Sequence, residues 1–485
     1  MAVGARGDRP ISITTPLGAD VFLALGLSGR EALSELFAFR LDLAAANDAQ
    51  VPFESLLGQP VTVAIALSSG GNRFFGGIVR RFGQGARGAR YTSYRAEVVP
   101  ALWLLTRKQS SRIFQQMSVP DILKRVLAGL DVDVKLQGTY APRNYCVQYR
   151  ESDFDFASRL MEEEGIFYFF THGADGHRLV VADSPQGHGD VPGTSTVAFD
   201  PTGGGRRSAQ DVIFQWEKDQ ELRSGLVTLR DTSFQLPGAS LEAQAAILDS
   251  VAVGNVIHKL KVGINDKLEN YDYPGSYAKH FDGIDPGGGE QPAELTKILA
   301  DGVRIAGIRM EQEALPSLQV VAASTAPQLT SGHRFALQGH FNGDGLYVLT
   351  SVDHAARAAH ASNGELTYTN QFTCIPIGLP YRPPRKTPSP HVSGTQTAIV
   401  VGPPGQEIFT DKYGRVKVQF FWDREGKKNQ NSSCWIRVSQ VGLGGSTVIP
   451  RIGQEVVVAF EEGDPDRPLI VGSVANARVP PTQLP

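Results

Sequence analysis

The sequence predicts a mainly β fold that ends in a small closed barrel, and three observations support this prediction. The 485 residues include 52 glycines and 30 prolines, which favour turns between short strands. Between residues 11 and 100, apolar segments alternate with clusters of Gly, Asn and Ser at a spacing typical of barrels. Between residues 394 and 476, about five short segments rich in β-branched and aromatic residues favour an OB-fold.

The strands predicted in the first hundred residues are 21–29, 36–43, 60–67, 74–82 and 93–100. A basic stretch, Arg80–Arg90 (RRFGQGARGAR), follows the fourth of them. One interpretation is a phosphate-binding patch. Its repeated Gly and Ala residues, with strands on both sides, favour an exposed hairpin loop instead.

Two helices are predicted from their capping residues. Ser118 with Asp121, and Ser152 with Asp155, each form a capping box at the start of an apolar helical pattern. Gly165 is the expected C-terminal cap of the second helix, because glycine adopts the left-handed conformation without steric cost.

Three consecutive acidic residues, Glu162–Glu164, fall at the C-terminal end of the second helix, where the helix dipole disfavours negative charge. A cation or another partner is therefore expected to compensate them. Together with Asp153 and Asp155 they also offer carboxylates of the kind used in glycoside hydrolysis. We favour a solvated acidic turn with a structural partner over a catalytic pair.

From residue 179 to about residue 373 the pattern returns to strands and long loops. The segment 241–252 (LEAQAAILDSVA) is the one helical candidate in this region, because it is rich in alanine.

A proline-rich linker is predicted next. Six prolines between Pro376 and Pro390 exclude this stretch from a sheet interior and favour an extended, semi-rigid spacer. Its basic residues, Arg382, Arg385 and Lys386, are expected to be solvated.

The clearest strand of the C-terminal region is 415–422, which follows a predicted turn at 411–414. Val416, Val418, Phe420 and Trp422 alternate along it with Arg415, Lys417, Gln419 and Phe421. This period of two predicts that the first set faces the core and that the second set faces solvent. Further strands are predicted at 433–440, 455–462 and 469–474, with a turn at 463–468.

No catalytic, cofactor-binding or metal-binding residues are predicted. The pairs His172 with His177 and His354 with His360 lack the spacing of metal ligands on one helix face. The stretch 441–447 (VGLGGST) nearly matches a dinucleotide-binding loop, but Thr447 replaces the third glycine and no helical pattern follows, so a turn is predicted. No pattern of a serine hydrolase, a zinc protease or a P-loop is present.

The charge, the aromatic residues and the cysteines argue against further classes of function. The net charge of −3 gives no general attraction to nucleic acids or anionic membranes. Trp422, Trp435 and Tyr413 could stack on bases or sugars, but the acidic stretches GDPD and FEEGD beside them oppose this function. The three cysteines, Cys146, Cys374 and Cys434, are far apart and are expected to be buried free thiols. Neither a signal peptide nor a membrane-spanning apolar run is recognised.

Three long blocks, 399–424, 431–440 and 449–476, resemble in sequence and order the spike signature of the VgrG family of the bacterial type VI secretion system. The segments 149–170, 271–277 and 349–357 resemble the head of the same family. The resemblance implies a head of two barrel-like subdomains, similar to a phage tail hub, followed by an OB-fold neck. It implies no catalytic role and no cofactor.

The resemblance also implies partners and location. Three chains would form a pseudo-hexameric base that docks on the hexameric Hcp tube, with baseplate proteins as neighbours and with effectors or adaptors as possible cargo. The protein would be cytoplasmic before firing and would then be secreted through the machine, without stable membrane anchoring. No nucleic-acid partner is implied.

Two features depart from the family pattern. The segment between Gln440 and Pro450 is shorter than the family's by about two residues and lacks the family's tryptophans. The contacts of this loop are therefore not implied by the resemblance. The chain stops at 477–485, where family members continue into a β-helical needle, so a truncated or blunt spike is expected and binding of a PAAR-repeat tip is in doubt.

These observations give a division into a head (1–378), a linker (379–393), an OB-fold neck (394–476) and the start of a truncated or absent needle (477–485). Two alternatives stay open. One is a hub-spike protein of a related contractile injection system or prophage tail. The other is a spike that carries its own effector enzyme, for which no catalytic constellation is present.

Overall fold

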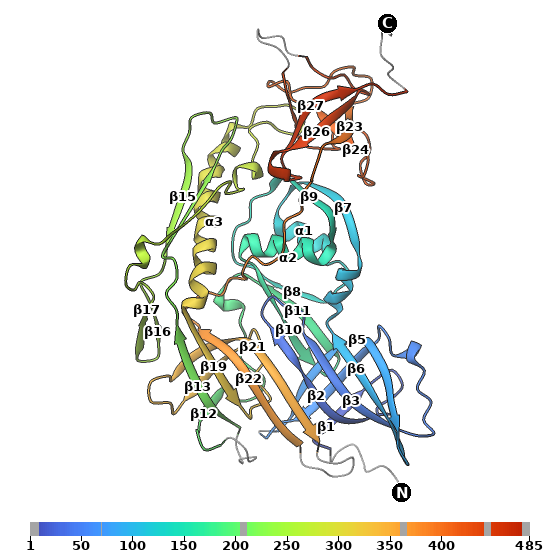
Figure 1. Cartoon of the computed structure of the whole chain (residues 1–485), viewed down its shortest axis with the longest axis vertical. Coiled ribbons are helices and arrows are strands. Elements are labelled where there is room, and N and C mark those ends of the chain that lie inside the picture. The colour runs from blue at the N-terminus through green and yellow to red at the C-terminus, as the bar shows by residue number, and fades with distance from the viewer. Residues whose placement is uncertain (1–8, 69, 204–210, 359–365, 441–447, 478–485) are drawn as a thin grey trace.

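The computed structural model describes residues 9–68, 70–203, 211–358, 366–440 and 448–477. The molecule is elongated, with two barrel-like units at one end and a small barrel at the other (Figure 1). The predicted mainly β fold with few helices is confirmed. We call the part of the chain up to β22 the head.

A half-barrel forms the start of the head. Its strands pair in the order β1-β4-β5-β6-β3-β2 around one apolar core. They are β1 (Ile11–Thr14), β2 (Leu23–Ala32), β3 (Ala38–Ala46), β4 (Pro60–Ala66), β5 (Asn72–Arg87) and β6 (Tyr91–Val99). The prediction of a hairpin loop at Arg80–Arg90 is wrong for most of that stretch. The strand β5 continues to Arg87, because Phe82 faces the core between outward-facing polar residues.

A closed six-stranded barrel lies beside the half-barrel. The order is β21-β20-β12-β13-β19-β22, and β22 pairs back onto β21 to close it. The strands are β12 (Thr196–Phe199), β13 (Val212–Gln220), β19 (Leu318–Ser324), β20 (Arg334–Gln338), β21 (Gly345–Ala358) and β22 (Leu366–Pro376). Because β2 pairs with β21, one continuous sheet joins the two units.

The two predicted helices lie between the barrels and the far end of the molecule. α1 (Val119–Val126) and α2 (Asp153–Glu164) begin at Ser118 and Ser152, whose side chains accept hydrogen bonds from the backbone N–H groups of Asp121 and Asp155. α2 ends at Gly165 with φ of 67°, as predicted. The neighbouring strands are β7 (Gln109–Met117), β8 (Val132–Lys135), β9 (Arg143–Ser152), β10 (Phe167–Gly173) and β11 (Gly176–Ala182).

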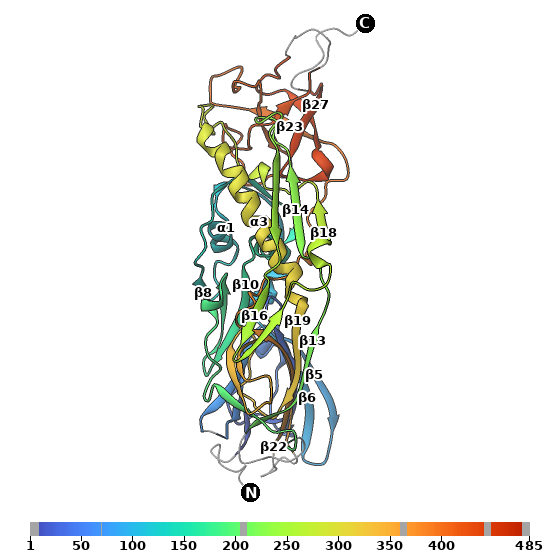
Figure 2. The same cartoon turned by 90° about the vertical axis from the view of Figure 1, so that its left-hand side faces the viewer.

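A small three-stranded sheet covers another side of the head. It has the order β15-β14-β18, and α3 (Lys297–Ala314) packs along β14 and β15 (Figure 2). The strands are β14 (Leu226–Asp231), β15 (Leu241–Ala246) and β18 (Glu269–Asp272), followed in space by the hairpin β16 (Ser250–Val253) and β17 (Val256–Lys259).

The helix predicted at 241–252 is wrong, because this segment forms β15 and β16. Leu241 and Ala243 alternate with exposed Glu242 and Gln244, and this period of two suits a strand covered on one face by α3. The helix α3 itself was not predicted.

The C-terminal barrel has five strands in the order β24-β23-β26-β27-β25, and a bridge between Val416 and Ile436 closes it. The strands are β23 (Gln396–Val401), β24 (Lys417–Phe420), β25 (Arg437–Val438), β26 (Glu455–Phe460) and β27 (Pro468–Val474). Val416, Val418 and Phe420 are buried in its core, as predicted.

The prediction that the opposite set on this strand faces solvent is wrong for Arg415, Lys417 and Gln419, which are also buried. Only Phe421 is exposed. The loops that cover the charged face come from the 423–435 segment and from the head.

Short 3-10 helices connect several strands. They are Phe53–Ser55, Ala101–Arg107, Pro185–Gly187, Asn265–Lys267, Ala278–His280, Pro292–Thr296, Leu315–Ser317 and Glu461–Gly463. Within the described ranges, no helix combines the length and the apolar composition that crossing a bilayer requires. The turn predicted at 441–447 and most of 477–485 lie outside the described residues.

Candidate functional site at the junction of the head and the OB barrel

The densest set of buried charges lies where the C-terminal barrel meets the head. The turn after β26 carries Asp464 and Asp466, and Nζ of Lys279 in the head lies 2.6 Å and 3.0 Å from their carboxylates. Burial alone would disfavour the charged lysine, but these two carboxylates raise its pKa. Asp466 also accepts a hydrogen bond from the backbone N–H of Val147 at 2.7 Å. The turn is thereby anchored to two separate elements of the head.

A second contact holds the strand β24 to the head through Arg415. Its guanidinium donates two hydrogen bonds to Asp282, at 2.6 Å and 2.9 Å, and its Nε donates to Asp411 at 2.6 Å. All three side chains are buried. Such a bidentate pair fixes orientation as well as distance.

An aromatic side chain reinforces this contact. The ring of Phe234, from the head, lies 5.1 Å from the guanidinium carbon of Arg415 and 5.0 Å from that of Arg437, both in the barrel. The ring of Tyr413, in the barrel, also contacts Phe234, with 5.3 Å between the two ring centroids. Two guanidinium groups of the barrel therefore lie over the Phe234 ring, and the face of an aromatic ring attracts cations.

The glycine-rich stretch Asp285–Gly289 of the head covers the face of β24 that was expected to be solvated. Trp435 donates through Nε1 to the carbonyl of Asp285 at 2.8 Å. Beneath it, Lys417 donates to the carbonyl of Gln430 and lies 4.8 Å from the Trp435 ring. Burial lowers the pKa of Lys417 to about 8.

The acidic end of α2 belongs to the same region. Glu163 and Glu164 pair with Arg143, and Glu164 also pairs with Arg304 at 2.7 Å. Glu162 accepts hydrogen bonds from the backbone N–H groups of Lys386 and Thr387. The expectation of compensating partners is confirmed, but the expectation of a solvated turn is wrong, because Glu162 and Glu164 are buried.

The proline-rich segment crosses the head as a bound strap. Leu379 and Tyr381 are buried, and Arg382 donates to the carbonyls of Gly165 and Asp183 and pairs with Glu311 at 2.5 Å. The expectation that the basic residues of this segment are solvated is therefore wrong for Arg382. It holds for the exposed side chains of Arg385 and Lys386.

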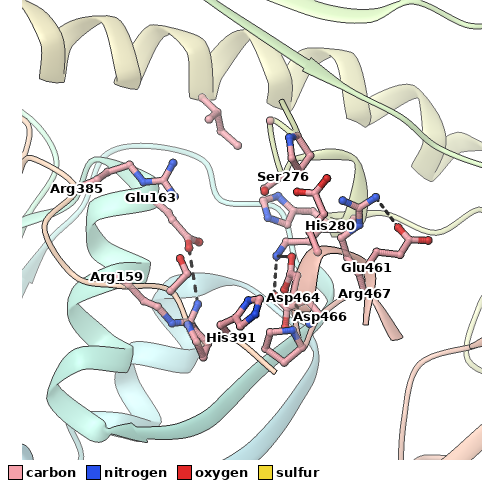
Figure 3. Close-up of a pocket in the computed structure, with 18 of the residues that line it drawn as sticks. Arg159, Glu163, Ser276, His280, Arg385, His391, Glu461, Asp464, Asp466 and Arg467 are labelled. Atoms are coloured by element: carbon pink, nitrogen blue, oxygen red, sulfur yellow. Dashed lines mark hydrogen bonds and ion pairs between the residues drawn. The ribbon is translucent and has the colours of Figure 1, made fainter. Parts of the chain in front are cut away.

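A cavity of about 250 Å³ lies between these elements. Figure 3 shows Arg159, Glu163 and Arg385 on one side of it, and Asp464, Asp466, Arg467 and Glu461 on the other, with His391 between them. Four of its carboxylates pair with cations of the protein, namely Glu163, Glu461, Asp464 and Asp466, and Arg467 lies 2.6 Å from Glu461. Charge-assisted contacts at these separations hold together the elements that carry the charges.

The carboxylates considered for glycoside hydrolysis are not brought together. Asp153 accepts hydrogen bonds from Arg112 at 2.7 Å and from Gln148 at 2.9 Å. The carboxylate of Asp155 accepts a hydrogen bond from the hydroxyl of Ser152, the N-cap of α2, at 2.7 Å. Glu163 lies at the other end of that helix and pairs with Arg143 and Arg159. Each acid has a structural role of its own.

The histidines singled out by spacing lie in the head. His172 and His177 face each other across the β10–β11 hairpin. His172 and His354 both approach the buried carboxylate of Glu31, which pairs with Arg73 at 3.0 Å. Among the described residues, no group of three or more His, Cys, Asp or Glu side chains is arranged to hold a metal ion. His360 lies outside them.

The remaining candidates are structural as well. Trp422 donates to Gln396 at 2.8 Å. All three cysteines are buried and unpaired with one another. The junction partners Lys279, Asp282 and Phe234 were not identified from the sequence, because each pairs with a residue more than a hundred positions away.

Comparison with known proteins defines the class. Residues 30–360 match the family model of the phage tail baseplate hub (GPD), and residues 408–474 match that of the type VI secretion system/phage-baseplate injector OB domain. The chain is therefore a baseplate hub joined to an injector OB domain.

The relatives identify the family. The spike protein VgrG1a of Pseudomonas aeruginosa is 41% identical over 490 residues, which cover 98% of this chain and 71% of that protein. VgrG1b of the same organism is 40% identical over 99% of this chain. The chain belongs to the VgrG family of type VI secretion system spike proteins. It spans 62% and 63% of the lengths of VgrG1b and VgrG1c.

Solved structures share the fold. The E. coli c3393 protein, described as a component of the type VI secretion system with structural similarity to the T4 bacteriophage tail proteins gp27 and gp5, matches with a TM-score of 0.63 at 21% identity. The match covers 96% of this chain and all of that chain. A chain of the Francisella PdpA-VgrG complex also shares the fold, with a TM-score of 0.59, 10% identity and coverage of 96% of this chain and 71% of that one.

The junction yields a first prediction. Asp282→Asn is expected to lower the free energy of unfolding by about 2 kcal/mol, because it leaves the buried guanidinium of Arg415 with Asp411 as its single carboxylate partner. Urea unfolding followed by tryptophan fluorescence measures the change.

The matched control is Glu290→Gln. It removes another ion pair between head and barrel, that of Glu290 with Lys412 at 2.8 Å, whose side chains are 63% and 43% exposed. An exposed pair contributes less than about 1 kcal/mol. Equal effects of the two substitutions would contradict the importance assigned to the buried contact.

Proposed function

We propose that this chain is a structural spike component of a type VI secretion system, acting as a homotrimer that caps the Hcp tube and carries effectors outward. The single observation that supports this most directly is the buried junction, where Lys279, Arg415 and Phe234 tie the hub-like head to the OB barrel. A protein driven against a membrane needs its parts to move as one body, and multiple desolvated contacts provide that.

In this proposal each successive part of the chain has its own role. Residues 1–378 form the hub that faces the tube, and residues 394–476 form the neck. The segment 379–393 connects them as a strap held to the head by Arg382 and Glu162. Two barrel-like units per chain would give a trimer six similar units, the number needed to match a six-fold ring.

The proposal extends to partners and location. Hcp and baseplate proteins contact the hub, and effectors or their adaptors travel with the complex. The chain acts in the cytoplasm until firing and is then expelled into the medium or a target cell. Its role is mechanical, and no catalysis is assigned to it.

The oligomeric state tests the proposal. Light scattering of the purified chain is expected to give three times the 52.3 kDa chain mass, and addition of Hcp hexamers is expected to shift the peak to a larger complex. Large obligate interfaces between rigid β units favour such an assembly.

A monomer at tens of micromolar, with or without Hcp, would contradict the proposal. A trimer that binds the tube protein of a contractile phage tail but not Hcp would instead favour a hub-spike of a related contractile system.

A further inference from the structure

The sheet that joins the two barrel-like units carries a concentration of arginines on its outer face. It runs through β5, β6, β3, β2 and β21, which lie at the lower end of the molecule in Figure 1. The strand registers place these residues in one row across it: Arg81, Glu97, Arg40, Ser28 and Ala355. The next row holds Gly83, Arg95, Asp42, Gly26 and Arg357. We call six arginines of these strands the basic sheet face, namely Arg30, Arg40, Arg80, Arg81, Arg95 and Arg357.

Positive charge exceeds negative charge on this face, although the whole chain has a net charge of −3. The outward-facing carboxylates of the five strands, all of which the structure describes, are Asp42, Glu97 and Asp353. Six guanidinium groups therefore share three carboxylates. Such a local excess of one sign attracts partners of the other sign and guides their approach.

The arginines of the face are held loosely by their own carboxylates. Arg81 lies 3.9 Å from Glu97 and Arg95 lies 3.6 Å from Asp42, and these two arginine side chains are 80% and 71% exposed. A charge-assisted hydrogen bond is shorter, at about 2.7 to 2.9 Å. Arg357 is exposed and makes neither a hydrogen bond nor an ion pair with the residues that the structure describes. These guanidinium groups are therefore free to turn toward a bound carboxylate.

The positions between the arginines are small. Ser28 and Ala355 follow Arg40 in its row, and Gly26 separates Asp42 from Arg357 in the other. A Cβ atom placed on Gly83, beside Arg95, would meet nothing within 4 Å. Another chain can therefore lie across the strands with its side chains within reach of the guanidinium groups.

We propose that the basic sheet face binds an acidic polypeptide segment of a different protein. Arginine suits this partner, because its planar guanidinium donates two parallel hydrogen bonds to one carboxylate. The inference goes beyond the function proposed above, since it requires neither a trimer nor the Hcp tube.

The pattern of charges favours an acidic polypeptide over a nucleic acid. Glu97 lies between Arg81 and Arg40 in one row, and Asp42 lies beside Arg95 in the next. A nucleic acid backbone carries a charge at every phosphate and would bring some of them against these two carboxylates. A polypeptide can place its acidic residues opposite the arginines alone. Neither row contains an aromatic residue on which a base could stack.

A second copy of this chain is a poorer partner, because its acidic clusters are already engaged. Asp464 and Asp466 pair with Lys279, and Glu163 and Glu164 pair with Arg143, within the same chain. Withdrawing these carboxylates from their buried partners would leave the cations unpaired, which is costly.

The width of the face sets the length of the probe. Four spacings of about 4.8 Å separate β5 from β21, so the face is about 19 Å wide. An extended peptide covers this distance with about six residues. A fluorescein-labelled peptide of about eight glutamates therefore suffices, and its binding is followed by fluorescence anisotropy at about 50 mM salt, where surface charges are weakly screened.

The test substitutes Arg95→Glu and Arg357→Glu together in the full chain. The dissociation constant of the glutamate peptide is expected to rise about tenfold or more, because two attractive charges become repulsive. The matched control is Arg178→Glu with Arg451→Glu, two arginines that lie outside the face, are 56% and 58% exposed and change the net charge equally. The control is expected to change the constant less than about twofold.

Chemical footprinting covers the case in which a charge-reversed variant folds poorly, because it uses the unmodified chain. Phenylglyoxal modifies exposed arginines, and peptide mapping by mass spectrometry locates the products. The glutamate peptide is expected to slow the modification of Arg95 and Arg357 and to leave that of Arg178 and Arg451 unchanged.

Three results would overturn the proposal. The first is the absence of peptide binding at low salt. The second is an equal loss of binding in the two double variants, or equal protection of all four arginines. The third is tighter binding of a single-stranded oligonucleotide of the same length, which would assign the face to a nucleic acid. None of these results depends on the number of chains in the assembly, so the homotrimer stands or falls separately.

Discussion

Lowering the pH from 7 to 5 is expected to reduce the free energy of unfolding of the head by about 6 kcal/mol, the largest effect that the structure implies. The cause is three histidines, the half-buried His177 and the buried His188 and His333, whose pKa values are lowered to about 4 by their removal from water. In the unfolded chain each titrates near 6.5, so at pH 5 the unfolded state binds roughly 2.6 more protons at these three sites than the folded state does. Stability is therefore full above pH 7 and is lost progressively between about pH 6.5 and 4.

The charged neighbours of these groups act in both directions, because cationic neighbours oppose protonation whereas Asp131 at His177 and Glu31 at His333 favour it. His177 lies beside His172 and opposite Asp131, and His188 lies near Arg334 and Lys135. His333 lies near Glu31, Arg73 and His172. The acids with lowered pKa values, such as Asp301 at about 2, add to the loss only at still lower pH.

Urea unfolding at closely spaced pH values measures how the free energy of unfolding changes with pH, and the expected loss between pH 6 and 5 is about 3.5 kcal/mol. The control replaces each ring by an amide that keeps its hydrogen bond. His177→Gln retains an acceptor for the N–H of Ala101, and His188→Asn and His333→Asn retain donors to the carbonyls of Gly332 and Ser331. In the triple variant, the free energy of unfolding is expected to lose most of its dependence on pH between pH 6 and 5. An unchanged slope would show that other groups bind the protons.

Val418→Asp is expected to unfold the OB barrel. The side chain is completely buried among Val400, Val416 and Val456, and an aspartate there has no cation to pair with, which costs several kcal/mol in a domain of marginal stability. Loss of the cooperative unfolding transition of the barrel, followed through Trp422 and Trp435, is the measurement.

The neighbouring residue provides the comparison. Lys417→Asp is expected to be nearly as damaging, because it places a carboxylate in a buried site close to Asp282 and Asp285. Phe421→Asp, at a side chain that is 64% exposed, is expected to change the stability by about 0.5 kcal/mol or less. A mild effect of Lys417→Asp would contradict the burial of that face.

Local signals allowed much of the fold to be predicted. The caps of α1 and α2 were identified because capping depends on residues within four positions of each other. The inward set of β24 was identified because alternation depends on the strand itself. Whether the outward-facing side chains of β24 are exposed or buried depends on a loop of the head that is more than a hundred residues away in the sequence. Lys417 was therefore predicted to be exposed, although it is buried.

The helix α3 and the segment 241–252 were missed for a related reason. Asp301, Gly302 and Gly307 interrupt the apolar face of α3 and lower its helix propensity. Asp301 is tolerated because it pairs with His280, and Gly302 because a Cβ there would lie 2.8 Å from the ring of Tyr277. The alanines of β15 are strand residues because the helix packs against them, and neither element signals this alone.

The junction was the least predictable part. The stretch 463–468 was identified as a turn, but nothing local indicated that Asp464 and Asp466 hold Lys279. The same holds for Arg382, whose three partners come from α2, the end of β11 and α3. Tertiary contacts between distant segments decide whether such charges are solvated or structural.

The burial of the three thiols has a chemical consequence for the secretion proposed above. Oxidation and disulfide exchange require the thiolate, and burial raises the pKa of Cys146 and Cys434 to about 12 and that of Cys374 well above its ordinary value. At neutral pH none of them offers a nucleophile to an oxidant or to glutathione. The folded chain therefore keeps the same covalent structure in a reducing cytosol and in an oxidising exterior.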